Sequence, residues 1–216
     1  MRATRMAVWL GGAVAVSGCG KTVRTECSSL LPLDFVGMEL QYALTDDAGG
    51  KGTRAYLGEG DFDGQTAWLE EEVLDAGDGF EVVTLSGYTC DKEGVWSLGF
   101  DQVLRDEHGP VAESTLRWDP PLRAFPSQPW VGDRWIGSST VTVTTDGDGL
   151  DDGGGTIDWK TTTEVTRADT QDIDGVTVDV LTLTVSGGVV DDPVSQHGLG
   201  VGLVRDSTRR LLSFED

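Results

Sequence analysis

The acidic stretch from Asp146 to Asp152 combines residue types and spacing that suit metal chemistry. Alternate aspartates around a glycine bring several carboxylate oxygens into one tight turn, and Ca²⁺ takes about six to eight such hard ligands. Asp146, Asp148 and Asp152 are therefore the candidate ligands of a calcium site that would serve adhesion or stability. The motif stands alone and lacks flanking helices, so an acidic hairpin loop without a metal explains the same residues equally well.

Other groups of reactive side chains lack the spacing that catalysis needs. Glu59 to Glu70 imitates an EF-hand loop, but its Asp-Gly pair is better explained as a hairpin turn, since such pairs tolerate positive φ. His108 lies in a turn sequence and His197 precedes a strand, and neither has a metal-ligand spacing or a neighbouring nucleophile. We therefore expect no catalytic residues and a protein that is not an enzyme.

The first nineteen residues carry an export signal. Arg2 and Arg5 precede an apolar run over residues 6–16, and small residues follow it, which is the pattern of a secretory signal peptide. Eleven apolar residues span only about half of a bilayer core, so this run is too short for a transmembrane helix.

Val16-Ser17-Gly18-Cys19 resembles the lipobox of bacterial lipoproteins. The resemblance implies cleavage before Cys19, a diacylglycerol on its sulfur and an acylated amino terminus, and several acyl chains together anchor firmly. It also implies a protein of the cell envelope, attached to the outer membrane in a Gram-negative cell, without indicating which face.

Cysteine count agrees with export. Of three cysteines, Cys19 is assigned to lipid, and the remaining pair, Cys27 and Cys90, is expected to form one disulfide in an oxidising compartment. Such a bond would join the lipidated segment to the folded body.

The charge balance limits the partners. Removing residues 1–18 takes away two of the 16 basic residues and none of the 37 acidic ones, which leaves a net charge of −23. A chain this acidic is repelled by phosphate backbones and anionic head groups, so we expect no nucleic-acid partner. Membrane attachment is expected through the lipid anchor rather than through a basic patch.

Strand signals dominate the remainder of the chain. Short runs of β-branched and aromatic residues alternate with Gly and Asp clusters, and residues 140–144 alternate cleanly as in a half-buried strand. The alternation of apolar and polar residues shifts by one position between Val180 and Leu181, which indicates a bulge or a strand covered on both faces. Leu116–Trp130 holds four of the seven prolines and is not expected to form a central strand.

A faint internal repeat divides the chain. Residues 1–18 are the expected signal peptide, 19–34 a lipidated tether, and 35–216 one β domain with pseudo-repeats at about 35–115 and 130–216. The predicted fold is therefore all-β: a curved antiparallel sheet, half-barrel or sandwich-like, with two related meanders joined by the proline-rich segment.

Three segments resemble strands found in exported bacterial proteins of half-barrel type, which are loosely similar to the periplasmic lipoprotein carriers. They are Leu33–Tyr42 and Pro129–Ile136, which resemble the strand that opens such a domain and recurs near mid-chain, and Gly198–Asp206, which resembles its last strand. The resemblance implies a non-catalytic envelope lipoprotein that is structural or binds an apolar ligand or an envelope partner. It carries over no catalytic residues. The six tryptophans after residue 18 fit either a packed core or an apolar concavity.

Overall fold

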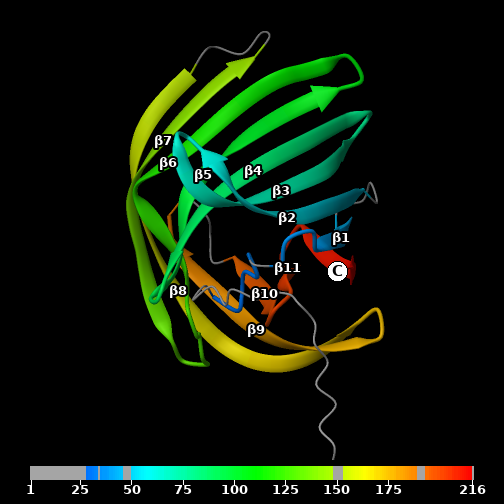
Figure 1. Cartoon of the computed structure of the whole chain (residues 1–216), viewed down its shortest axis with the longest axis vertical. Helices are drawn as coiled ribbons and strands as arrows, with labels where there is room; N and C mark the ends of the chain where they lie inside the picture. Colours follow the sequence, from blue (N-terminus) through cyan, green and yellow to red (C-terminus); the bar gives the residue numbers. More distant parts are fainter. Residues whose placement is uncertain (1–27, 34, 46–49, 148–152, 189–192, 216) are drawn as a thin grey trace, which may run out of the picture.

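The described part of the chain is one antiparallel sheet of twelve strands (Figure 1). The structure is a computed structural model, and it describes residues 28–33, 35–45, 50–147, 153–188 and 193–215. The strands are β1 (Glu39–Leu44), β2 (Lys51–Phe62), β3 (Gln65–Gly77), β4 (Phe80–Asp91), β5 (Gly94–Asp106), β6 (Gly109–Pro126), β7 (Arg134–Gly147), β8 (Gly153–Ile173), β9 (Val176–Gly187), β10 (Val194–Gly198), β11 (Gly202–Arg205) and β12 (Arg209–Glu215). No helix within the described ranges is long and apolar enough to cross a membrane.

The sheet closes on itself. Each strand pairs with the next along the chain, and β1 pairs with both β2 and β12, in the latter case from Glu39 opposite Glu215 to Leu44 opposite Arg209. Closure gives every strand two neighbours and so removes the unpaired edges of an open sheet. The prediction of an all-β antiparallel fold is thus confirmed, whereas the half-barrel and the sandwich-like arrangement are wrong.

The proline-rich segment is part of a central strand, contrary to the sequence-based prediction. β6 lies between β5 and β7, and the two expected meanders are one continuous meander. Pro120 and Pro121 are tolerated because they fall in a bulge: the pairing with β5 steps from Leu122 directly to Arg117. A residue without an N–H is acceptable where the ladder is interrupted.

Local turn and strand signals are confirmed elsewhere. Asp63 and Gly64 have φ of 55° and 77°, and Asp174 and Gly175 have φ of 51° and 81°, so the Asp-Gly pairs form the tight hairpin turns that the sequence predicts. Val180 and its neighbour Leu181 are both buried, which explains the slip in apolar phase by cover on both faces of β9.

A segment from before β1 fills one half of the barrel. Leu30, Leu31 and Leu33 are buried, and Figure 1 shows this blue segment inside the curve of the sheet, next to β10 and β11. The Gly200 N–H donates to the Ser29 carbonyl at 2.7 Å. The last residues of the predicted tether therefore belong to the core of the barrel, where they pack against residues of β1, β2 and β9 to β12.

A smaller cluster lies where the β2–β3 hairpin folds against the neighbouring strands. Phe62 is buried there with Ala67 and Leu98. The guanidinium carbon of Arg117 lies 4.6 Å from the centroid of the Phe62 ring. A Cβ atom on Gly87 would lie 2.4 Å from that ring, so the contact requires glycine at this position.

Candidate functional site

Three rows of register partners cross β2 to β7 on the face that carries the buried Tyr56. Directly paired residues of neighbouring strands share a face of the sheet, and the next residue on that face is two positions away. The first inner row is Tyr56, Glu70, Ser86, Phe100, Leu116 and Val143; the second is Arg54, Glu72, Thr84, Gln102, Ser114 and Thr145; the third is Gly52, Leu74, Val82, Leu104, Ala112 and Gly147. We call these three rows the inner face, because Tyr56 packs in the core with Leu31 and Leu33 of the internal segment.

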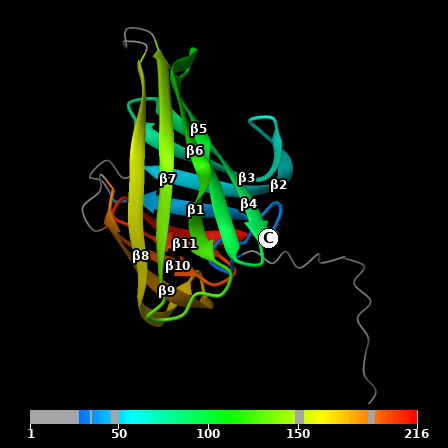
Figure 2. The same cartoon turned by 90° about the vertical axis from the view of Figure 1, so that its left-hand side faces the viewer.

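The inner face changes from filled to unfilled along the rows. Tyr56 in β2 and Glu70 in β3 are buried, as expected for side chains that point into a packed barrel. From β4 onward every member of the three rows is only half-buried, including the apolar Phe100, Leu116 and Leu104. Figure 2 shows that β5 to β8 extend beyond the other strands at one end of the barrel. The side chains of these rows are therefore partly accessible to solvent beyond β3.

The rows differ in polarity. The first and third rows are mainly apolar beyond β3, with Phe100, Leu116 and Val143 in one and Leu74, Val82, Leu104 and Ala112 in the other. The second row between them carries hydroxyl and amide groups, and Gln102 Nε2 donates to Thr84 Oγ1 at 3.2 Å. Two apolar rows on either side of a polar row suit a ligand with an apolar body. Burial of its apolar surface supplies affinity, and the few polar groups of the second row fix its orientation.

A group of buried charges closes one end of these rows. Arg54 Nη1 lies 3.5 Å from Glu70 Oε1, and Arg54 Nη2 donates to Glu72 Oε1 at 2.8 Å. Arg209 of β12 also pairs with Glu72, and its Nε lies 3.1 Å from Asp206 Oδ2. Since β1 and β2 lie between β12 and β3 in the sheet, this ion cluster (Arg54, Glu70, Glu72, Asp206 and Arg209) spans the closure of the barrel.

The two glutamates of the ion cluster titrate differently. Burial raises the pKa of Glu70 above its usual range, because desolvation of its carboxylate outweighs the attraction of Arg54. Burial acts on Glu72 in the same direction, but the guanidinium groups of Arg54 and Arg209 hold its pKa below the usual range. Glu70 is only 4% exposed. Among the described residues its Oε2 atom has no hydrogen-bond partner. The neighbouring Tyr88 also lowers the pKa of Glu70 through a side-chain hydrogen bond, against the larger effect of burial.

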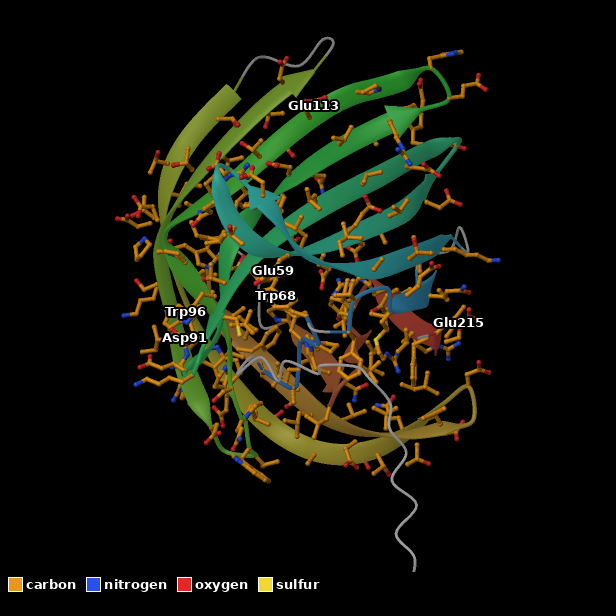
Figure 3. The ribbon with its side chains drawn as sticks, in the orientation of Figure 1. Glu59, Trp68, Asp91, Trp96, Glu113 and Glu215 are labelled. Carbon is orange, nitrogen blue, oxygen red and sulfur yellow. The ribbon has the colours of Figure 1, made fainter. Side chains whose placement is uncertain are left out.

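Tyrosines and a tryptophan surround the ion cluster. The Arg54 guanidinium carbon lies 5.9 Å from the Tyr42 ring centroid, and burial raises the pKa of Tyr42 and Tyr88, which keeps both phenols neutral. Trp68 pairs with Tyr88 in the register, and Figure 3 shows Trp68 within the barrel, whereas Trp96 lies at its left-hand wall. The tryptophans are therefore divided: Trp68 belongs to the lined interior, and Trp135 is buried in the core.

The candidate calcium ligands fall mostly outside the described residues. Asp146 is exposed at the end of β7, opposite Glu113 of β6, while Asp148 and Asp152 lie in a range that the structure does not describe. Among the residues that it does describe, no three His, Cys, Asp or Glu side chains are arranged to hold a metal ion. The calcium site stays a prediction.

The cysteines are described only in part. Cys90 lies in β4 opposite Val95 of β5, and it is not a free thiol. Cys19 and Cys27 lie outside the described residues. Lipidation of Cys19 and the pairing of Cys27 with Cys90 therefore stay predictions.

The ion cluster is not among the sites that the sequence predicts. A signal was present in β3, where Trp68, Glu70, Glu72 and Leu74 alternate with residues of the other face. Two carboxylates in phase with Trp68 and Leu74 indicate charges on the apolar face of a strand. The local sequence does not show that Arg54 and Arg209 are their partners, because these contacts depend on which strands pair and in which register.

Comparisons with known proteins give no match: no protein-family model, no curated protein and no solved structure is significantly similar to this chain.

Proposed function

We propose that this chain is a non-catalytic, lipid-anchored protein of the cell envelope that binds an amphipathic ligand against the inner face of its barrel. The lipobox ending at Cys19 supports the anchor and the location. The observation that carries the binding role is the set of half-buried apolar side chains on the inner face, in a barrel whose other half is filled by its own core.

The size of the barrel supports a ligand in its interior. Barrels of about eight strands are just wide enough for side chains to fill, and wider ones enclose cavities. A twelve-strand barrel that uses an internal segment to fill one half leaves inward-facing apolar surface in the other half. An acyl chain or a similar apolar body covers such surface and gains about 25 cal/mol for each Å² removed from water.

The ion cluster supports an amphipathic rather than a purely apolar ligand. Glu70 and Arg54 stand at the β2–β3 end of the apolar rows, and Glu70 Oε2 is an acceptor without a partner among the described residues. A ligand head group with hydrogen-bond donors would satisfy this atom, and an unpaired buried polar atom is costly for the protein.

Binding is tested with a fluorescent fatty acid and two valine variants that differ only in face. Val82 belongs to the third inner row, while Val83 is the next residue in β4, half-buried on the opposite face. We expect Val82→Glu to weaken binding by about tenfold or more, and Val83→Glu to change it by less than about twofold. Circular dichroism confirms that both variants fold. Equal affinities for the two variants, or no binding by the unchanged protein, would overturn the binding role.

The anchor is tested separately by mass spectrometry of the mature protein. A diacylglycerol mass on Cys19 at the amino terminus is the expected result. An unmodified Cys19, or an amino terminus elsewhere, would refute the anchor and leave the binding experiment unaffected.

A further inference from the structure

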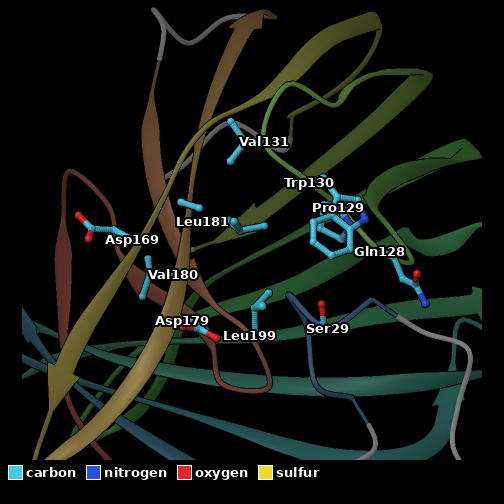
Figure 4. Close-up of a pocket in the computed structure, with 11 residues that line it drawn as sticks. Ser29, Gln128, Pro129, Trp130, Val131, Asp169, Asp179, Val180, Leu181 and Leu199 are labelled. Atoms are coloured by element: carbon cyan, nitrogen blue, oxygen red, sulfur yellow. The ribbon is translucent and has the colours of Figure 1, made fainter.

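An apolar pocket with an exposed rim lies at the end of the barrel where the loop between β6 and β7 meets the turn between β10 and β11. Its volume is about 270 Å³, and Figure 4 shows the side chains around it. The large apolar side chains of the lining are those of Pro129, Trp130, Val131, Val180, Leu181 and Leu199. Val180 and Leu181 are buried and form its floor.

The rim side chains are large, apolar and exposed. Trp130 is 70% exposed, Val131 55% and Leu199 39%, and all three border the same pocket. Single exposed apolar residues are ordinary on a protein surface, but several of them gathered at a pocket mark an interaction site.

Hydrogen bonds hold the rim in its exposed position. The Trp130 N–H donates to Asp133 Oδ2 at 2.8 Å, and the Gly132 N–H donates to the Val165 carbonyl of β8 at 2.8 Å. On the other side the Leu199 N–H donates to the Asp179 carbonyl of β9 at 2.8 Å. Both rim segments are thus bonded to the barrel wall or within their own turn, which fixes the backbone that carries Trp130 and Leu199.

The pocket adjoins the point from which the chain leads back toward Cys19. Ser29 contributes to the lining, and its carbonyl accepts the hydrogen bond from Gly200 next to Leu199. Only residues 20–28 separate Cys19 from Ser29. Ten residue steps of fully extended chain span at most about 36 Å. A lipid on Cys19 would therefore keep this end of the barrel within reach of the bilayer.

We propose that this face, formed by Trp130, Val131 and Leu199 around the pocket, contacts the surface of a phospholipid bilayer directly. The inference rests on the proposed anchoring at Cys19, which supplies the proximity. Trp130 suits the contact because an indole ring has an apolar body and a polar N–H, and such rings concentrate at the boundary between acyl chains and head groups.

The charge around the pocket selects the kind of lipid. Asp169, which is paired with Arg167, and Asp179 line the pocket, and Asp133 holds the turn that carries Trp130. Carboxylates repel anionic head groups, so the contact is expected with zwitterionic lipid and weakens as anionic lipid is added.

The test uses the mature chain with Cys19→Ser, which carries no acyl group, and vesicles of phosphatidylcholine. Its binding, measured by co-sedimentation, is expected to fall about tenfold on Trp130→Ala. Phosphatidylcholine brominated in its acyl chains is expected to quench part of the tryptophan fluorescence, and this quenched part is expected to be missing in Trp130→Ala, which keeps the other five tryptophans. The matched control is Leu212→Ala in β12, because Leu212 is 42% exposed, follows the buried Leu211 and so lies on the other face of the sheet, and does not line the pocket. We expect Leu212→Ala to change binding by less than about twofold.

Three results would overturn the membrane contact: no binding of the Cys19→Ser protein to phosphatidylcholine, an equal loss in the two alanine variants, or stronger binding when anionic lipid is added. Leu199→Ser provides a second rim variant and is expected to weaken binding in the same direction as Trp130→Ala. Because the protein in this assay has no lipid, the outcome is independent of mass spectrometry at Cys19, and the two proposals fail separately.

Discussion

Removal of Arg54 is the sharpest test of the ion cluster. The Arg54→Met variant keeps the length of the side chain but leaves Glu70, which is only 4% exposed, without the cation that lies 3.5 Å from its Oε1 atom. Glu72 keeps Arg209 as a partner. Removing one partner of a buried ion pair costs about 3–5 kcal/mol of unfolding free energy. With a urea m-value of about 3 kcal/mol/M, a loss of about 4 kcal/mol lowers the urea midpoint by about 1.3 M.

The loss is expected to depend on pH with a definite sign. Arg54 lowers the pKa of Glu70, so its removal raises that pKa further above the unfolded value of 4.5. A carboxyl group whose folded pKa is raised stabilises the fold below the unfolded pKa, and this stability is lost as the pH rises through the folded pKa. The deficit of Arg54→Met is therefore larger at about pH 8 than at about pH 5, where Glu70 takes up a proton more readily.

Urea unfolding followed by tryptophan fluorescence measures this deficit, and a double variant isolates its cause. Arg54→Met/Glu70→Gln removes both charges and is expected to unfold within about 1 kcal/mol of the unchanged protein at neutral pH. If the double variant is as unstable as Arg54→Met, or if the deficit is the same at both pH values, the assignment of the effect to an unpaired Glu70 carboxylate is refuted.

Two further predictions concern stability. Phe62→Ala is expected to lower the free energy of unfolding by about 3–5 kcal/mol, because it leaves a cavity in the cluster beside Gly87. Leu57→Ala, at an exposed position of the same strand, is expected to change it by less than about 0.5 kcal/mol. Thermal unfolding of both variants measures the difference. Burial lowers the pKa of His197 from 6.5 to about 4, so between these values the unfolded chain binds more protons and stability is lost as the pH falls. This contributes about 3 kcal/mol, and His197→Leu is expected to remove that part of the acid sensitivity, measured as urea midpoints across the range. The control variant His108→Leu, at an exposed turn, is expected to keep the acid sensitivity of the unchanged protein. An unchanged pH profile in His197→Leu would contradict the assignment of this sensitivity to His197.

The sequence predicts what depends on neighbours in the chain. The alternation over residues 140–144 and the Asp-Gly turn ending at Gly64 depend on local backbone preferences, and both are confirmed. Closure of the barrel depends on pairing between β1 and β12, and no local pattern encodes a partner so distant in sequence. The same limit applies to the ion cluster: the phase of Glu70 and Glu72 is visible in the sequence, but their contact with Arg209 follows only from the closed topology.

Pairing of β1 with β12 joins strands that are far apart in the sequence. Glu39 lies opposite Glu215, so the seam between β1 and β12 cannot form until β12 has been synthesised. Joining two distant strands costs loop-closure entropy, and folds rich in such long-range pairs form slowly. A chain that lacks residues 209–216 loses β12 and with it Arg209, which leaves β1 without one of its two neighbours. Without β12 the unpaired edge of β1 is a site at which another chain can pair, so the same seam that closes the barrel also protects it from edge-to-edge association.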